Sequence, residues 1–251
     1  MPHARPLRSR RLRPILLLTA AITLVTPAAA SALTVYGAAS LSDAFPRIDG
    51  SPSYNFAGSN QLQLQIERGA PADVFASASP SEANALFREG RCSRPVTFAT
   101  NVLVVITPKS NPAGIRSAYD LRSGGRRLAI GTAGVPIGSY TRRLLRRMQL
   151  TPVLTTNTVS LEPNVNSIVA KVGLGSADAG FAYFSDYLAA RSRLNLVRLP
   201  RWAQPPVRYG MCAVRRAGAD TAGANRFMQR VLSANGRRVL KRFGFGLPPR
   251  A

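Results

Sequence analysis

Strand-like and helix-like patterns alternate along most of this chain. Three short runs suited to buried strands lie at 33–36, 54–56 and 73–76. Each is followed by a segment in which apolar residues recur at helical spacing, at 40–45, 61–68 and 81–88. Repeated strand and helix units joined by short loops predict a parallel sheet with helices on both faces.

A second set of alternating elements follows the most strand-like run of the chain, 101–107 (NVLVVIT), which ends at Pro108. Its predicted strands cover 128–130 and 179–183, and its predicted helices cover 139–148, 165–172 and 185–190. Prolines at 200, 205 and 206 then interrupt the pattern. A further strand is predicted at 207–214, and a C-terminal helix at 225–243.

The extended segments near 101–107 and 207–214 flank this second set of units. A chain that leaves one lobe, builds another and returns would have this order. We therefore predict an α/β protein of two lobes, the first comprising 33–104 and 208–251 and the second 105–207. Ligands bind preferentially in the cleft between such lobes.

The first 32 residues (1–32) have the pattern of a secretory signal peptide. Five arginines precede an apolar run at 15–25, and small residues follow up to Ala32. Because a membrane-spanning helix needs about 20 apolar residues, this shorter run favours a cleaved signal over an anchor. We expect cleavage near Ala32 and a periplasmic product without a lipid anchor, since no cysteine stands at the cut. Sec and twin-arginine export both remain open.

Side chains that could support catalysis are scarce. The chain has one histidine, His3, and it lies in the predicted signal, which excludes histidine-based triads and metal sites from the exported chain. We therefore expect a binding protein with no catalytic residues, no cofactor and no direct metal ligands. Cys92 and Cys212 could form a disulfide in an oxidising compartment or stay free, and the sequence leaves both open.

The chain is strongly basic, with 34 Lys and Arg residues against 11 Asp and Glu. Removal of the predicted signal leaves 29 basic residues and a net charge of +18. Such a charge suits a polyanion partner, but the arginines are dispersed and no nucleic-acid-binding motif accompanies them. We therefore expect no nucleic acid partner.

Two strand-to-helix turns of the first lobe carry small and hydroxyl residues. The turn 37–43 contains Ser40, and the turn 56–60 contains Ser59. Small residues let a ligand approach the backbone, and the following helices direct unpaired N–H groups to the same place. Neither turn contains Lys or Arg, so together they would bind an anion through neutral donors. Asp43 is the only nearby group that could accept a hydrogen bond from a protonated anion such as phosphate.

The second lobe offers similar features. The glycine-rich turn 131–140 joins a strand to a helix and matches no nucleotide-binding fingerprint. Asn164 opens the next helix, and Tyr183 ends a strand with a phenol that could donate one hydrogen bond. Each feature also has an ordinary structural explanation, such as a helix N-cap or a core tyrosine, so no single turn identifies a site.

Together these segments resemble the periplasmic molybdate-binding proteins of ABC transporters. The resemblance covers nearly all of the chain after residue 32 and is carried by 38–41 (AASL), 56–59 (FAGS), 65–75 (QIERGAPADVF), 177–183 and 243–245 (FGF). It implies the two-lobed periplasmic-binding-protein fold of class II type, with a mixed sheet flanked by helices in each lobe and two hinge strands. It also implies a monomer that binds molybdate or tungstate and delivers it to a membrane permease.

By the same resemblance, donors from both lobes would hold the oxyanion. The hydroxyls of Ser40 and Ser59 would donate from the first lobe, and the backbone N–H groups of Ile137 and Val165 and the phenol of Tyr183 from the second. The metal atom would be held only through the oxygens of the anion. Sulfate, thiosulfate or another oxyanion is the first alternative ligand, and a polyanion is the second.

Two stretches depart from this family. The segment 41–54 is shorter than usual, and Pro46 stands where the first helix normally continues, so we expect that helix to be cut short. The loop 132–135 lacks the usual Asp-Pro and is one residue shorter. Both changes lie beside the predicted anion-binding turns and bear on selectivity more than on fold.

Overall fold

The computed structural model of the chain describes Met1 and residues 32–248. The signal peptide predicted at 1–32 therefore lies almost entirely outside the described residues. From Ala32 onward the chain forms one compact unit. Within the described part of the chain, no helix is long and apolar enough to cross a membrane.

The first of two sheets has five strands in the order β2-β1-β3-β10-β4. Its strands are β1 (Thr34–Ala38), β2 (Ser53–Ala57), β3 (Val74–Ser77), β4 (Val96–Asn101) and β10 (Val207–Ala213). Strand β1 pairs in parallel with β2 and β3, whereas β10 runs antiparallel to β3 and β4. The sheet is therefore mixed.

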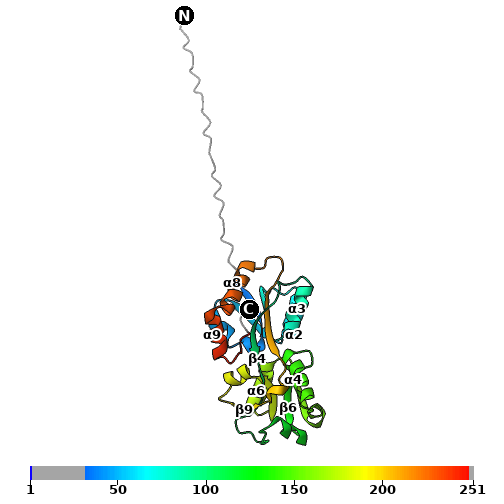
Figure 1. Cartoon of the computed structure of the whole chain (residues 1–251). Coiled ribbons are helices and arrows are strands. Elements are labelled where there is room, and N and C mark those ends of the chain that lie inside the picture. Colours follow the sequence, from blue (N-terminus) through cyan, green and yellow to red (C-terminus); the bar gives the residue numbers. More distant parts are fainter. Residues whose placement is uncertain (2–31, 249–251) are drawn as a thin grey trace. The chain divides into compact units, whose positions relative to one another are not determined.

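Helices cover both faces of the first sheet. They are α1 (Phe45–Ile48), α2 (Ser59–Glu67), α3 (Pro80–Arg88), α8 (Thr221–Leu232) and α9 (Ala234–Arg242), with a short 3-10 helix η1 (Ala39–Leu41). Helices α2 and α3 lie on one side of the sheet, and α8 and α9 lie on the other (Figure 1). Because β1, β2 and β3 run in parallel, the turns that follow their carboxyl ends lie at one edge of the sheet.

The second sheet repeats the arrangement of the first, in the order β7-β6-β8-β5-β9. Its strands are β5 (Leu103–Pro108), β6 (Arg127–Gly131), β7 (Thr158–Glu162), β8 (Ala179–Tyr183) and β9 (Leu194–Arg198). Strand β6 pairs in parallel with β7 and β8, and β5 runs antiparallel to β8 and β9. The helices around it are η2 (Ala118–Ser123), α4 (Pro136–Arg147), α5 (Val153–Thr156), α6 (Val165–Gly173), α7 (Phe184–Ala189) and η3 (Arg201–Ala203).

The chain passes between the two sheets twice. It leaves the first sheet where β4 ends at Asn101 and β5 begins at Leu103, and it returns between the end of β9 at Arg198 and the start of β10 at Val207. The predicted two-lobed α/β fold with a mixed sheet in each lobe and two crossing strands is confirmed. The division into lobes at 33–104, 105–207 and 208–251 stays a prediction.

Several local predictions were wrong. The sheets are not purely parallel, because β10 and β5 each run against their neighbours. The helix expected at 40–45 is a 3-10 turn followed by α1, and Pro46 lies in the first turn of α1, where its missing N–H is tolerated. The helix expected at 225–243 is two helices, separated at Ser233, whose side chain accepts from the N–H of Gly236 and caps α9.

Two groups of buried apolar side chains hold the fold together. The larger is continuous through both sheets and includes strand β5, all of whose residues are buried. The smaller lies in the first lobe, between α2, α3 and β10, and contains Cys92 and Cys212. Both cysteines are free and fully buried, and hydrogen bonding with Cys92 together with burial raises the pKa of Cys212. They belong to the same buried group, and Cys92 pairs with Val214, two residues from Cys212.

Candidate functional site

A small cavity lies between the two lobes, next to the carboxyl ends of three strands from each sheet. The space among its lining atoms, together with the solvent to which it opens, is about 210 Å³. The residues around it are uncharged and mostly small: Ala38, Ala39, Ser40, Ala57, Gly58, Ser59, Ala78, Val135, Pro136, Ile137, Asn164, Val165 and Tyr183. Ligands of α/β proteins bind preferentially at such positions, outside the carboxyl ends of parallel strands.

The first lobe presents two hydroxyl groups to the cavity. Ser59 is the first residue of α2, and its Oγ accepts a hydrogen bond from the N–H of Ala78 at 3.1 Å, which leaves its own proton free to donate. Ser40 lies in η1, and its Oγ is 2.9 Å from the phenol oxygen of Tyr209. Both serines are buried, and these two hydrogen bonds hold their side chains in place.

The second lobe presents the first turns of two helices. Ile137 is the second residue of α4, after Pro136, and Val165 is the first residue of α6. N–H groups at these positions have no acceptor within their own helix, and they carry the partial positive charge of the helix N-terminus. Asn164 fixes the start of α6 because its side chain accepts from the N–H of Ser167 at 3.0 Å.

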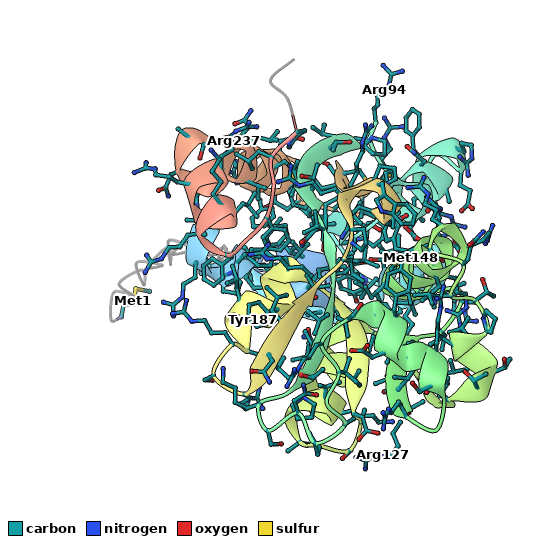
Figure 2. All side chains as sticks on the ribbon, turned by 60° about the horizontal axis from the view of Figure 1, so that its bottom comes forward. Met1, Arg94, Arg127, Met148, Tyr187 and Arg237 are labelled. Atoms are coloured by element: carbon teal, nitrogen blue, oxygen red, sulfur yellow. The ribbon has the colours of Figure 1, made fainter. Side chains whose placement is uncertain are left out.

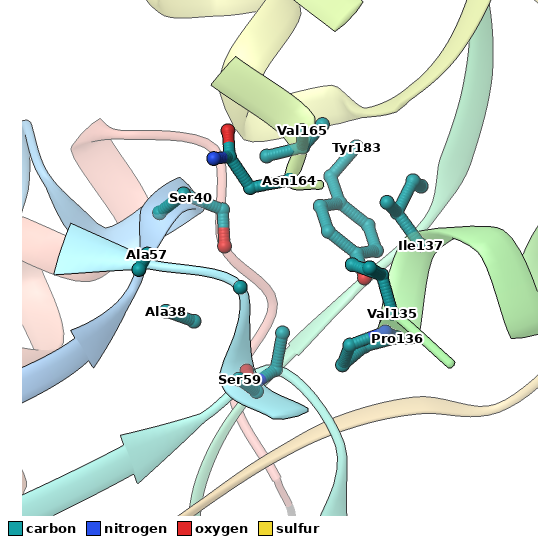
Figure 3. Close-up of a pocket in the computed structure, with 13 residues that line it drawn as sticks. Ala38, Ser40, Ala57, Ser59, Val135, Pro136, Ile137, Asn164, Val165 and Tyr183 are labelled. Atoms are coloured by element: carbon teal, nitrogen blue, oxygen red, sulfur yellow. The ribbon is translucent and has the colours of Figure 1, made fainter. Parts of the chain in front are cut away.

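Tyr183 closes the cavity from the end of β8. Its side chain is 1% exposed, and its hydroxyl has no hydrogen-bond partner among the described residues. Figure 3 shows the hydroxyls of Tyr183 and Ser40 directed into the space between the two lobes. Burial raises the pKa of Tyr183 well above its usual range, so the phenol remains a hydrogen-bond donor. A buried hydroxyl without a partner is uncommon and needs an explanation.

The charged residues lie away from the cavity. Asp43 is exposed and lines a separate groove, so among the described residues the cavity contains no carboxylate acceptor. The basic residues are spread over the surface, as Arg94, Arg127 and Arg237 illustrate (Figure 2). Arg142 on α4 approaches the neighbouring turn, but its guanidinium donates to the carbonyls of Gly131 and Gly138 at 2.9 and 3.1 Å. The cavity therefore offers neutral donors only.

The two lobes touch each other beside the cavity. A Cβ atom added to Gly58 would lie 2.4 Å from the carbonyl oxygen of Pro163, which belongs to the second lobe. Asn166 of α6 donates to the hydroxyl of Ser42 at 3.4 Å. Only glycine fits at position 58 in this arrangement, because the two lobes are in direct contact beside the cavity.

All five residues that the sequence predicted as ligand donors line this one cavity. The structure brings Ser40 and Ser59 together with Ile137, Val165 and Tyr183, although their binding role stays a prediction. The sequence reasoning missed Tyr209, the buried partner of Ser40. The sequence did indicate a tyrosine in a buried strand. Because a buried phenol normally has a hydrogen-bond partner, this position predicted a polar contact but did not identify its partner.

The site has no feature of a metal centre built from side chains. Among residues 32–248, no three or more His, Cys, Asp or Glu side chains are grouped so as to hold a metal ion. The donors around the cavity are hydroxyl and backbone N–H groups, which suit the oxygen atoms of an anion.

Comparison with known proteins identifies the family. The sequence model described as bacterial extracellular solute-binding protein matches residues 52–246. The molybdate-binding protein ModA of Mycobacterium tuberculosis is 36% identical over 229 residues, covering 87% of this chain and 86% of that protein. ModA of Escherichia coli is 28% identical over 232 residues, covering 85% and 88%.

A solved structure shares the fold. The periplasmic molybdate-binding protein of Azotobacter vinelandii superposes with a TM-score of 0.75 at 21% identity, covering 86% of this chain and all of that one. The arrangement of two mixed sheets around a cavity is therefore the arrangement found in periplasmic binding proteins. The chain belongs to the family of bacterial extracellular solute-binding proteins.

Proposed function

We propose that this protein binds a small tetrahedral oxyanion, molybdate or tungstate, in the cavity between its lobes and delivers it to a membrane ABC permease. The observation that carries the proposal is the unpartnered hydroxyl of Tyr183. It is buried, it remains protonated, and it points into a cavity that also receives the Ser40 and Ser59 hydroxyls. An anion with an oxygen atom at this position would supply the missing acceptor.

The chemistry of the cavity supports an anion that carries no proton. Its lining contains donors and no carboxylate, so a fully deprotonated dianion can accept a hydrogen bond at every contact. A protonated anion such as hydrogen phosphate would place its own hydrogen against another donor, which costs free energy. Molybdate, tungstate and sulfate all satisfy this condition, and the relatives named as molybdate-binding proteins favour molybdate over sulfate.

The remaining parts of the proposal concern the setting of the protein. Membership of an extracellular solute-binding family supports export, and the sequence pattern at 1–32 favours a periplasmic product cleaved near Ala32 without a lipid anchor. The protein would carry the ligand without chemical change, and therefore without catalysis or a cofactor. We also propose that it acts as a monomer. Its partners would be the oxyanion and the permease, with no nucleic acid.

Titration calorimetry of residues 33–251 with molybdate, tungstate, sulfate and phosphate tests the proposal. We expect saturable heat with molybdate and tungstate, weaker binding of sulfate, and the weakest binding of phosphate. The absence of heat with all four anions would contradict oxyanion binding. Tighter binding of sulfate than of molybdate would contradict the ligand assignment and favour the sulfate alternative.

The polyanion alternative makes a different prediction from the same preparation. A basic protein that binds polyanions is retained by heparin, and its binding collapses with salt because counterions are released. Binding of molybdate by neutral donors in a closed cavity should depend only weakly on salt, since buried contacts are screened little. Heparin binding without molybdate heat would support the alternative and contradict the proposal.

A further inference from the structure

Tyr209 lies directly behind one of the proposed oxyanion donors. It is in β10, the strand by which the chain returns to the first lobe, and its side chain is fully buried. Its phenol oxygen is 2.9 Å from Oγ of Ser40, and either oxygen could be the donor in this hydrogen bond. Which of the two donates decides whether the proton of Ser40 is free to reach a ligand in the cavity.

Asn101 has an amide hydrogen that could influence the direction of this hydrogen bond. Its Oδ1 accepts from the N–H of Val102 at 2.9 Å, which places its amide nitrogen on the other side, where it donates to Oγ of Ser185 at 2.9 Å. The amide nitrogen has a second hydrogen. Burial and the carboxyl group of Asp186 raise the pKa of Tyr209, and hydrogen bonding of its phenol oxygen with Ser40 and Asn101 opposes that rise.

If the second amide hydrogen of Asn101 is donated to the phenol oxygen, the phenol directs its own proton elsewhere. Ser40 is the hydroxyl within reach, and a phenol is a more acidic group than an aliphatic hydroxyl, so the phenol is the better donor of the two. If Tyr209 donates to Ser40, the Ser40 proton turns toward the cavity. Asn101 then donates to Tyr209, Tyr209 donates to Ser40, and Ser40 donates to the ligand.

The ring of Tyr209 also supports the donor from the other lobe. It meets the ring of Tyr183 at 5.9 Å between centroids and 64° between planes. On its other sides it meets Phe98 at 6.0 Å and Phe245 at 5.4 Å, both nearly perpendicular. Edge-to-face contacts of this kind are favourable and hold the ring in one orientation. Tyr209 therefore contacts a proposed ligand donor of each lobe without lining the cavity itself.

We propose that Tyr209 is a positioning residue for oxyanion binding, which donates its phenol proton to Ser40 so that the Ser40 hydroxyl is oriented as a donor to the anion. This inference rests on the proposed function, because it assigns to Tyr209 an effect on that same site. Asn101, where the polypeptide crosses between the lobes, would fix the direction of this series of hydrogen bonds.

A double-mutant cycle tests the inference, with molybdate as the titrant. Tyr209→Phe keeps the ring and removes the hydroxyl, and we expect it to weaken molybdate binding about three- to tenfold, the effect of one neutral hydrogen bond. In a Ser40→Ala background the same change should alter the affinity by less than about twofold, because the group that Tyr209 orients is absent. A purely structural role would weaken binding equally in both backgrounds.

Two further variants complete the test. Tyr54→Phe is the matched control, because the Tyr54 hydroxyl donates to the carbonyls of Phe45 and Asp49 inside the first lobe, away from the cavity; molybdate affinity should not change. Asn101→Asp keeps the acceptor for Val102 but removes both amide hydrogens. Tyr209 would then donate to the carboxylate and require the Ser40 proton, so affinity should fall at least as far as in Tyr209→Phe.

The outcomes separate this inference from the proposed function. If the unmodified protein binds molybdate but Tyr209→Phe leaves the affinity unchanged, or weakens it equally with and without Ser40, the positioning role is wrong and the function stands. Unchanged affinity in a folded Asn101→Asp protein would also overturn the proposed direction. If the unmodified protein binds none of the oxyanions, the proposed function itself is wrong.

Discussion

Replacement of Tyr183 by Phe should change binding and stability in opposite directions. The substitution removes one oxygen atom from a fully buried side chain and keeps the ring that packs against Tyr209. The hydroxyl has no partner within the described structure, so its removal breaks no hydrogen bond of the ligand-free protein. With an oxyanion in the cavity, the same change would remove a donor to a charged group.

The two effects have different sizes. A hydrogen bond to a charged group contributes about 1.5–3 kcal/mol, so the affinity for molybdate should fall by roughly ten- to 150-fold. An unsatisfied buried hydroxyl costs free energy, so the ligand-free Tyr183→Phe protein should be as stable as the unmodified protein or more stable by up to about 1 kcal/mol. Most buried substitutions destabilise, which makes this combination distinctive.

Titration calorimetry measures the affinity, and urea unfolding without ligand measures the stability. Tyr54→Phe is the control, because its hydroxyl is hydrogen-bonded to backbone carbonyls in the first lobe. That variant should lose about 1 kcal/mol of stability and keep its affinity. The reasoning would be refuted if Tyr183→Phe destabilised the ligand-free protein like the control, or if its molybdate affinity were unchanged.

Three further predictions concern closure, pH and the cysteines. Gly58→Ala should weaken molybdate binding by roughly five- to 150-fold, because the added Cβ overlaps the facing lobe at a cost of about 1–3 kcal/mol. Gly134→Ala, where the nearest atom to the added Cβ is 3.6 Å away, should leave the affinity unchanged. Equal calorimetric affinities of the two variants would contradict this prediction. Burial raises the pKa of Asp186 from 3.8 to about 8. Between pH 3.8 and about pH 8 the folded state therefore holds a proton on this carboxyl group that the unfolded state has lost. The free energy of unfolding should then fall as the pH rises through this range, by up to about 1.4 kcal/mol per pH unit. Asp186→Asn should remove that decline in urea unfolding at pH 5 and pH 8, and an unchanged difference would contradict it. Refolding with oxidised glutathione should join Cys92 to Cys212, which lie in one buried group, and lower the mass by two hydrogens. Two remaining free thiols would contradict this.

The alternation of strands and helices was predictable where local pattern and burial agree. Strand β8 (Ala179–Tyr183) and helix α6 (Val165–Gly173) lie within one residue of their predicted bounds, because their apolar residues have the period of the element they form. The separate strand β4 (Val96–Asn101) was missed, since polar residues interrupt it. The antiparallel course of β10 could not be predicted either, because strand direction depends on contacts between distant segments.

The site was predictable to a similar degree. Turns with small and hydroxyl residues after strands indicated Ser40 and Ser59, and the resemblance supplied Ile137, Val165 and Tyr183; all five line one cavity. Tyr209 could not be placed from the sequence, because 169 residues separate it from Ser40. Its contact follows from the pairing of β10 with β3 inside the first sheet, which no local pattern encodes.

The most direct test of the account is a crystal structure of residues 33–251 grown with tungstate or molybdate, with anomalous diffraction used to locate the heavy atom. The account predicts one strong anomalous peak in the cavity between the lobes. The oxygen atoms around it should lie within hydrogen-bond distance of the hydroxyls of Ser40, Ser59 and Tyr183. An empty cavity, or a peak bound only by surface arginines, would contradict the proposal that neutral donors between the lobes hold the oxyanion.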